Sequence, residues 1–113
     1  MSLRTLERAA QAQAPVFSAL GDPTRLWLVG RLLDGDAQSI SELTAGSQLT
    51  RQAISKHLRV LEEAGIVRNA RAGRESRYEL DPQPIADARA FLDRVSAQWD
   101  AALGRLRVLA EQT

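Results

Sequence analysis

Two capped helices follow one another almost without a gap in the middle of the chain. Ser41 can cap a short helix that ends near Gly46, and Thr50 can cap a longer helix over about residues 51–64. The longer helix carries one apolar stripe at i, i+4 and i+7, formed by Ile54, Leu58 and Leu61. Two helices joined by such a short turn indicate a helix-turn-helix.

A strand pair follows the second helix directly. Gly65 stands where a left-handed residue ends a helix, and Gly73 with Arg74 suits a tight turn between strands at 66–72 and 75–80. A helix-turn-helix followed by such a hairpin predicts a winged helix-turn-helix, in which the hairpin is the wing.

The N-terminal part of the chain is predicted to be helical. Pro15 suits the first turn of a helix, so we expect one helix at about 3–14 and another at about 15–20. Asp22 and Pro23 have the residue types of an N-cap and a first helical position. The helix that follows is expected to place four residues on one core-facing side, namely Leu26, Val29, Leu32 and Leu33.

A long C-terminal helix over about 84–110 has more apolar surface than one small winged core can cover. Its apolar residues recur at alternating three- and four-residue steps over almost four heptads. The first helix is its obvious companion, so we expect a homodimer built from the two terminal helices. The predicted interface residues are Leu3, Leu6, Leu92, Val95, Trp99, Leu103 and Leu106.

These elements predict one domain, mainly α-helical with a two-stranded β wing. Its expected parts are dimerisation helices at 1–20 and 84–113, a helix-turn-helix at 41–64 and a wing at 66–81 of the 113 residues.

Charge is unevenly distributed along the chain, although the net charge is only +1. Residues 47–77 hold seven basic and three acidic residues, a balance of +4, and the remainder has a balance of −3. A basic middle segment can present one face to phosphate groups. The cations are almost all arginine, which forms bidentate pairs with phosphate and with guanine edges.

The second helix of the predicted helix-turn-helix, hereafter the recognition helix, has a donor-rich side opposite its apolar stripe. We expect base contacts from the residues near its N-terminus and phosphate contacts from Thr50 and Arg59. Arg74 at the wing tip is expected in or beside the minor groove. Arg71 and Arg77 either approach phosphates or remain solvated charges. The candidate DNA-binding residues are Thr50, Arg51, Gln52, Ser55, Lys56, Arg59, Arg71, Arg74 and Arg77.

Several classes of function lack the residues they need. The chain has no cysteine and one histidine, so disulfides, thiolate zinc sites and thiol nucleophiles are excluded. No catalytic constellation or phosphate-cradling glycine loop stands out, so we expect neither an enzyme nor a cofactor. The sequence also shows no signal peptide or membrane-spanning run, and we expect a cytoplasmic protein.

Three motifs in the same order resemble the ArsR/SmtB family of bacterial repressors. They are Leu20 to Leu26 (LGDPTRL), Ala53 to Val67 (AISKHLRVLEEAGIV), and Gly73-Arg74 with Tyr78 to Asp81. The resemblance implies a homodimeric winged helix that represses, often at its own promoter, by binding an inverted-repeat operator. The C-terminal Phe91, Leu92 and Trp99 resemble a metal-independent branch, whose members often neighbour a START-like lipid- or polyketide-binding protein.

The metal sites of that family do not carry over to this chain. One uses closely spaced cysteines on the first helix of the helix-turn-helix, where this chain has residues 41–45 (SELTA). Another uses Asp and His on C-terminal helices, and no histidine follows His57. Without soft or imidazole ligands, metal sensing is not expected.

Two smaller expectations concern Arg25 and His57. Arg25 is expected to form a structural ion pair, and His57 to lie on the flank of the recognition helix, packed or bonded to backbone or phosphate. Trp27 and Trp99 are expected in core or dimer packing, although they could line a small-molecule pocket.

Two other functions remain open. A winged helix can serve protein–protein interaction without DNA, although a basic recognition face disfavours this reading. A regulator of this kind can also respond to a small organic effector bound at its dimer interface.

Overall fold

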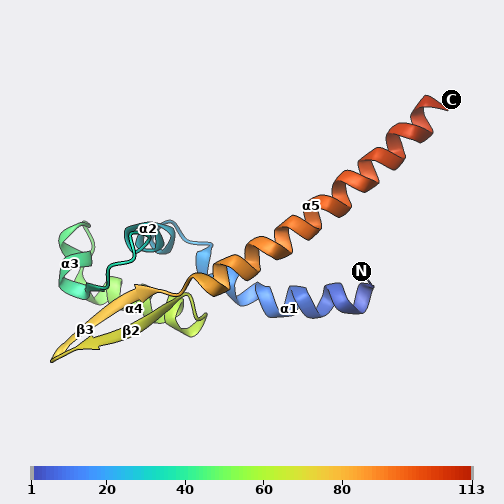
Figure 1. Cartoon of the computed structure of the whole chain (residues 1–113). Helices are drawn as coiled ribbons and strands as arrows, with labels where there is room; N and C mark the ends of the chain where they lie inside the picture. Colours follow the sequence, from blue (N-terminus) through green and yellow to red (C-terminus); the bar gives the residue numbers. More distant parts are fainter. Residues whose placement is uncertain (1, 113) are drawn as a thin grey trace.

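The computed structural model describes residues 2–112, apart from the side chain of Ala72. Figure 1 shows a winged body at one end, from which a long helix projects away on the side opposite the hairpin, within extents of 68 × 28 × 21 Å. The elements in chain order are α1 (Leu3–Leu20), α2 (Pro23–Arg31), β1 (Gln38–Ser39), α3 (Ile40–Ala45), α4 (Arg51–Glu63), β2 (Val67–Ala72), β3 (Glu75–Leu80) and α5 (Pro82–Glu111).

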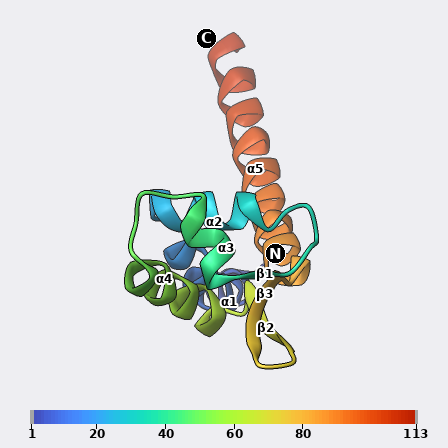
Figure 2. The same ribbon diagram turned by 90° about the vertical axis from the view of Figure 1, so that its left-hand side faces the viewer.

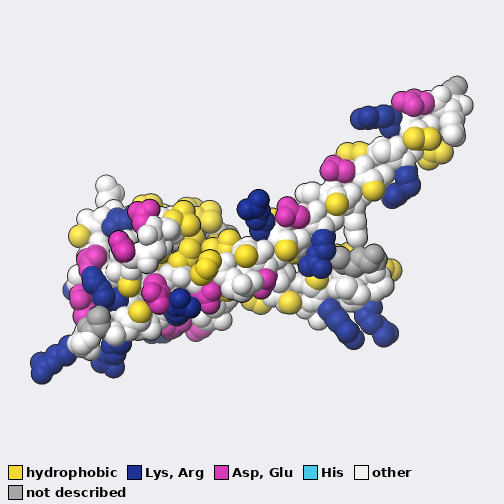
Figure 3. Space-filling model, in the orientation of Figure 1, with side chains coloured by type: hydrophobic (Ala, Val, Ile, Leu, Met, Phe, Trp, Pro, Cys, Tyr) yellow, Lys and Arg dark blue, Asp and Glu magenta, His cyan; other side chains and the backbone are white. Residues whose placement is uncertain are grey.

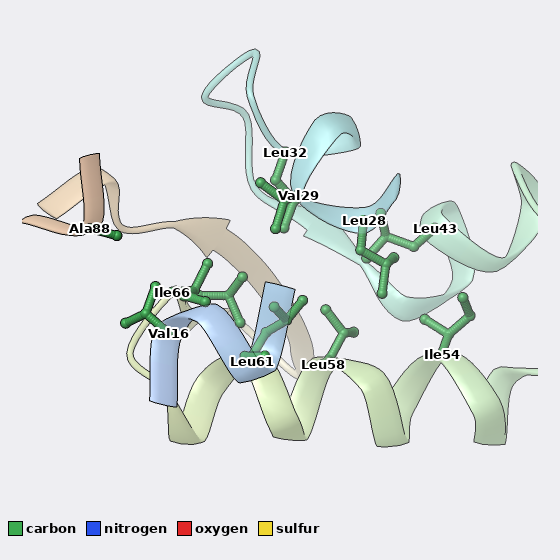
Figure 4. Packing of buried hydrophobic residues seen from close by; sticks show 12 residues of the cluster. Val16, Leu28, Val29, Leu32, Leu43, Ile54, Leu58, Leu61, Ile66 and Ala88 are labelled. Carbon is green, nitrogen blue, oxygen red and sulfur yellow. The ribbon is translucent and has the colours of Figure 1, made fainter. Parts of the chain in front are cut away.

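The hydrophobic core lies between α4 and the elements that cover it. Ile54, Leu58 and Leu61 of α4 are fully buried. In Figure 4, Ile54 and Leu58 point towards Leu28 and Leu43, whereas Leu61 lies beside α1 and Ile66. Burying an aliphatic side chain of this size contributes about 1.5–3 kcal/mol each. The apolar stripe of α4 thus fixes which face of this helix turns outward. The other buried residues are Val16, Ala19, Leu28, Val29, Leu32, Leu43, Ile66, Val67 and Ala88.

The predicted caps are confirmed in three places. The Asp22 carboxylate accepts the backbone N–H groups of Thr24 and Arg25 at 2.9 and 3.1 Å. The Thr50 hydroxyl accepts the N–H of Ala53 at 3.1 Å, and Gly65 has the left-handed φ of +78° expected after a helix.

The short helix α3 begins two residues earlier than expected. Ser39 rather than Ser41 is its N-cap, and the Ser39 hydroxyl accepts the N–H of Glu42 at 3.1 Å. The Glu42 carboxylate also accepts a hydrogen bond from that hydroxyl at 3.3 Å, which holds the Ser39 side chain in its capping position.

The sheet has a third strand that was not expected. Its order is β1-β3-β2, all antiparallel, with Gln38 opposite Tyr78 and Ser39 opposite Arg77. A strand of two residues shows no alternation in the sequence, so only the fold reveals it. Its pairing places the start of α3 against the wing.

The predicted break at Pro15 is wrong, because α1 runs through it as one helix of 18 residues. Interior proline costs a helix about 3 kcal/mol. Val16 and Ala19 directly after it are buried in the core, and Phe17 contacts α5. This packing keeps the helix continuous.

The core-facing side of α2 also differs from the prediction. Leu28 is fully buried, whereas Leu26 and Leu33 are 54% and 66% exposed. The helix ends at Arg31, so the helical periodicity on which the prediction relied does not extend to Leu33. Val29 and Leu32 are buried as predicted.

Candidate nucleic-acid interface

The outward face of α4 carries the polar residues that the sequence predicted there. Arg51, Gln52, Lys56 and Arg59 are exposed and Ser55 is half-buried, because the opposite stripe of the helix is fixed in the core. With Ile40 these five residues line a shallow groove. Thr50 is exposed beside them, with its hydroxyl engaged in capping the helix.

The wing lies on the same side of the molecule as α4, as Figure 2 shows. Its two strands pair from Val67–Leu80 to Ala72–Glu75, which leaves Gly73 and Arg74 as the turn. Gly73 has a φ of +66°, whereas Arg74 does not have a positive φ, the pattern of a type II′ turn. Arg74 is therefore exposed at the tip of the hairpin.

Five of the candidate cations are free to meet an anion. Within residues 2–112, their charged groups have no hydrogen bond or ion pair with other side chains. In Figure 3, Lys and Arg side chains project from the wing end of the molecule beside Asp and Glu side chains, and others lie along the two terminal helices. These five are Arg51, Lys56, Arg59, Arg71 and Arg74.

Arg77 differs from these five because it already has partners. Its guanidinium donates to a carboxylate oxygen of Glu42 and lies 4.0 Å from Glu75. The Arg77–Glu42 pair joins β3 to α3. Arg77 is thus engaged within the protein, and the structure favours a positioning role for it over a phosphate contact.

Arg68 is engaged in the same way, at the base of the wing. Its Nε donates to Glu79 at 2.8 Å, and a second nitrogen lies 3.8 Å from Asp81. The hydrogen bond and charge of Glu79 raise the pKa of this guanidinium above its usual value.

The structure brings Arg51 and Arg74 together at one notch, which sequence reasoning did not foresee. The other residues that line it are Ser39, Ile40, Ser41, Glu75 and Ser76, so one carboxylate shares the notch with the two guanidinium groups. These residues come from β1, α3, α4 and the wing, which the β1–β3 pairing and the Arg77–Glu42 pair help to bring side by side. No local pattern in the sequence could have identified Ser41 or Ser76.

A cluster around Asp22 lies where α2 begins and touches α4. The backbone N–H of Arg25, with the nearby Arg25 and His57 side chains, holds the pKa of the Asp22 carboxyl below its usual value despite partial desolvation. His57 lies on the flank of α4 as expected. Arg25 is structural as expected, but its side-chain partners are backbone carbonyls and the His57 ring rather than a carboxylate.

The terminal helices expose the residues predicted for a dimer interface. Trp99 and Leu106 are 64% and 62% exposed on α5, and Leu3 is exposed on α1. Leu92, Val95 and Leu103 are also exposed on α5, while Leu6 is half-buried on α1. Trp27, by contrast, packs against the core. The Arg31 guanidinium carbon lies over the Trp27 ring, 5.3 Å from the ring centroid.

Two other kinds of site are absent from the described residues. In the range 2–112, no three His, Cys, Asp or Glu side chains gather closely enough to hold a metal ion. None of the helices in that range is long and apolar enough to cross a membrane.

Comparisons with known proteins agree on one family. A profile described as a helix-turn-helix domain matches residues 20–69. An HTH-type transcriptional regulator of Mycobacterium tuberculosis is 39% identical over 87 residues, which cover 77% of this chain and 78% of that protein. The solved structure of an ArsR-like transcriptional regulator from Rhodococcus sp. RHA1 is 35% identical, with a TM-score of 0.80 over 88% of this chain and 93% of that one.

The chain belongs to the ArsR family of transcriptional regulators. A further relative is described as a probable mercury resistance operon repressor of Streptomyces lividans, 33% identical over 80% of this chain and 71% of that protein. The comparisons confirm the predicted winged helix-turn-helix fold. They also place this ArsR-family chain among regulators rather than enzymes.

Proposed function

We propose that this ArsR-family regulator binds double-stranded DNA as a homodimer and represses transcription from an inverted-repeat operator, its own promoter included. The free cations of α4 and of the wing, gathered on one side of the molecule, are the observation that carries the proposal. The same proposal places the protein in the cytoplasm, with the DNA that it regulates.

The recognition helix α4 supplies the sequence-specific contacts. Its N-terminal turn exposes Arg51 and Gln52, and the next turn exposes Lys56. Arginine suits a guanine edge and glutamine suits an adenine edge in the major groove. Arg59, farther along the helix, contacts phosphate and contributes affinity without sequence preference.

The wing supplies contacts beside those of α4. Arg74 at its tip enters or borders the minor groove, while Arg71 approaches the backbone. The notch that Arg51 and Arg74 share with Ser41 and Ser76 offers two cations to one backbone phosphate. Glu75 also lines the notch, and its carboxylate lies 4.0 Å from the Arg77 guanidinium. Arg77 contributes by holding α3 against the wing.

Dimerisation uses the terminal helices. A monomer rarely exposes a continuous apolar stripe such as that of α5, where Trp99 and Leu106 are more than half exposed. Figure 1 shows that α1 and α5 extend away from α4 and the wing. Pairing through them leaves both recognition helices free to enter successive major grooves about one turn apart.

The signal that releases the DNA is not a metal ion in this proposal. The chain lacks cysteine, and its one histidine, His57, hydrogen-bonds Arg25. A small organic effector at the dimer interface remains compatible with the fold, and the apolar surface around Trp99 is the place to seek it. A role in protein interaction alone is disfavoured by the basic face of α4.

Selection of bound duplexes from a random pool tests the proposal. We expect the wild type to enrich an inverted repeat whose half-site centres lie about 10 bp apart or at a multiple of that distance. A variant with Gln52→Ala and Lys56→Ala changes two exposed side chains and keeps the core, so it should enrich that sequence poorly. A wild type that enriches no sequence contradicts the proposal.

A further inference from the structure

One guanidinium group joins three helices beside the recognition helix. Nε of Arg25 donates to the carbonyl of Ala19 at 2.5 Å, and Nη2 donates to the carbonyl of Ser18 at 3.4 Å. Both carbonyls belong to the last turn of α1. Nη1 of the same group lies 3.3 Å from Nδ1 of His57, in the middle of α4. Arg25 itself belongs to the first turn of α2.

The backbone of Arg25 is held by Asp22, the N-cap residue of α2. Asp22 accepts the backbone N–H of Arg25 at 3.1 Å, and its Oδ2 also lies 3.8 Å from Nδ1 of His57. The side chains of Asp22 and His57 are 31% and 24% exposed. The cluster is therefore partly shielded from water, so its hydrogen bonds are stronger than those between fully exposed groups.

The geometry fixes the hydrogen-bonding role of each His57 nitrogen. A guanidinium can only donate hydrogen bonds, so Nδ1 of His57 has to accept. The proton of the neutral ring then resides on Nε2. The interaction requires both the forked donor set of Arg25 and an acceptor at the Nδ1 position.

The helices that meet at Arg25 have different tasks in the proposed function. The first helix, α1, belongs to the dimer interface, whereas α4 reads the DNA. In a two-fold dimer, the angle between α1 and α4 determines how far apart the two recognition helices stand. A small rotation of α4 against α1 changes that separation for both half-sites together.

We propose that Arg25 and His57 are positioning residues, and that their contact orients α4 relative to α1 and thereby sets the half-site spacing that the dimer accepts. This inference rests on the proposed function. It assigns no direct DNA contact to either residue. It predicts that loss of the contact changes which spacing between half-sites the dimer prefers, while the affinity for a single half-site is kept.

The test uses four variants of the full chain. Arg25→Lys keeps the charge but loses the planar fork, and His57→Phe keeps a ring but loses the acceptor. His57→Asn restores an acceptor oxygen near the Nδ1 position, because its Oδ1 is bonded to Cγ as Nδ1 is. Arg31→Lys is the matched control, because Arg31 also lies in α2 but its guanidinium donates to Gln38, at 3.2 Å, rather than to a residue of α4.

Affinities are measured on duplexes with the selected half-sites at their selected spacing and with one or two base pairs added or removed. We expect the affinity of the wild type to fall about tenfold or more when the spacing changes, the equivalent of 1.4 kcal/mol. Arg25→Lys and His57→Phe should reduce that penalty to about threefold or less, while affinity for a single half-site stays within about twofold. His57→Asn and Arg31→Lys should keep the wild-type penalty.

Two outcomes separate this inference from the proposed function. A wild type with a clear spacing preference that Arg25→Lys and His57→Phe both retain overturns the inference and leaves the proposed function intact. A wild type that binds none of these duplexes overturns the proposed function, and the inference with it. Sedimentation of each variant confirms that it remains folded and self-associates like the wild type.

A second readout does not depend on DNA. His57 is the one histidine in the chain, so its side-chain nitrogens give a single set of ¹⁵N signals. We expect the Nε2–H tautomer in the wild type and a shift of the Nδ1 signal in Arg25→Lys but not in Arg31→Lys. A wild type with its proton on Nδ1 contradicts the contact and the inference.

Discussion

Phe17 and Phe91 join the two terminal helices, with ring centroids 6.2 Å apart and ring planes inclined by 57°. Phe17 lies in the last turns of α1, and Phe91 lies in the first third of α5. A tilted arrangement of this kind is a favourable one for two aromatic rings. The pair holds α1 beside α5 near the winged body, before the exposed part of α5 begins.

Phe91→Ala should therefore loosen the angle between the terminal helices. Replacing a buried phenylalanine by alanine costs about 3–5 kcal/mol, and we expect about 2 kcal/mol here because both rings are only half-buried. Urea unfolding at a fixed protein concentration measures the loss. Phe91→Leu, which keeps most of the apolar volume, should lose clearly less of the free energy of unfolding. Equal losses in both variants would argue against the ring contact.

Asp22 should make stability depend on pH in the acid range. Its folded-state pKa lies below the usual value of 3.8, mainly because of the hydrogen bond from the Arg25 N–H. A carboxyl whose pKa is lowered on folding contributes stability above its unfolded pKa, and loses that contribution as the pH falls through its folded pKa. Asp22→Ala should therefore unfold at lower urea concentration than the wild type at pH 7, with a smaller difference below pH 3.8.

Asp22→Asn is the matched control for that experiment. Asparagine keeps an oxygen that can cap α2, so this variant should recover much of the loss at pH 7. A difference between wild type and Asp22→Ala that stays constant from pH 7 to pH 3 would show that the carboxylate charge contributes nothing.

Gln52 and Arg59 should affect DNA binding in different ways. Gln52→Ala should cost about 1–3 kcal/mol at one base position of each half-site and relax the preference there. Arg59→Ala should weaken binding to every sequence and flatten its dependence on salt, because one phosphate contact is lost. Titrations with operator and random duplexes at several salt concentrations distinguish the two. Wild-type behaviour in both variants would mean that α4 does not read the DNA.

Arg74→Ala should weaken DNA binding without changing the fold. Arg74 is exposed at the wing tip with no side-chain partner among the described residues. Arg68→Ala is the control on the same hairpin, since Arg68 is engaged with Glu79 and should affect stability more than binding. Circular dichroism and gel shift provide the two measurements. Undiminished affinity in Arg74→Ala would leave the wing a structural role only.

Zinc, cadmium, nickel and arsenite should neither bind tightly nor release the DNA. Titration calorimetry of the free protein and anisotropy of the DNA complex test both statements. A stoichiometric metal with sub-micromolar affinity that changes DNA affinity would refute the proposal that the protein does not sense metal ions.

The features that the sequence predicted well are local ones. Asp22, Thr50 and Gly65 act within one or two turns of their own position, so their residue types are sufficient to place the ends of helices. The stripe of Ile54, Leu58 and Leu61 likewise depends on one helix alone.

The features that it missed depend on contacts between distant segments. The two-residue strand β1 exists because Ser39 pairs with Arg77, and α1 continues through Pro15 because its last turns pack on the core. The contact from Arg25 to His57 spans 32 positions in the chain. None of these has a periodic or compositional signal in its own segment.

Recognition of an inverted repeat depends on dimerisation of the chain. Sedimentation velocity at micromolar concentration tests dimerisation most directly. The wild type should sediment as a dimer and bind the selected duplex with two chains per duplex. Trp99→Ala with Leu106→Ala, which removes two side chains that are exposed in the single chain, should sediment as a folded monomer with much weaker DNA binding. A wild-type monomer that binds one asymmetric half-site tightly would contradict the proposed assembly.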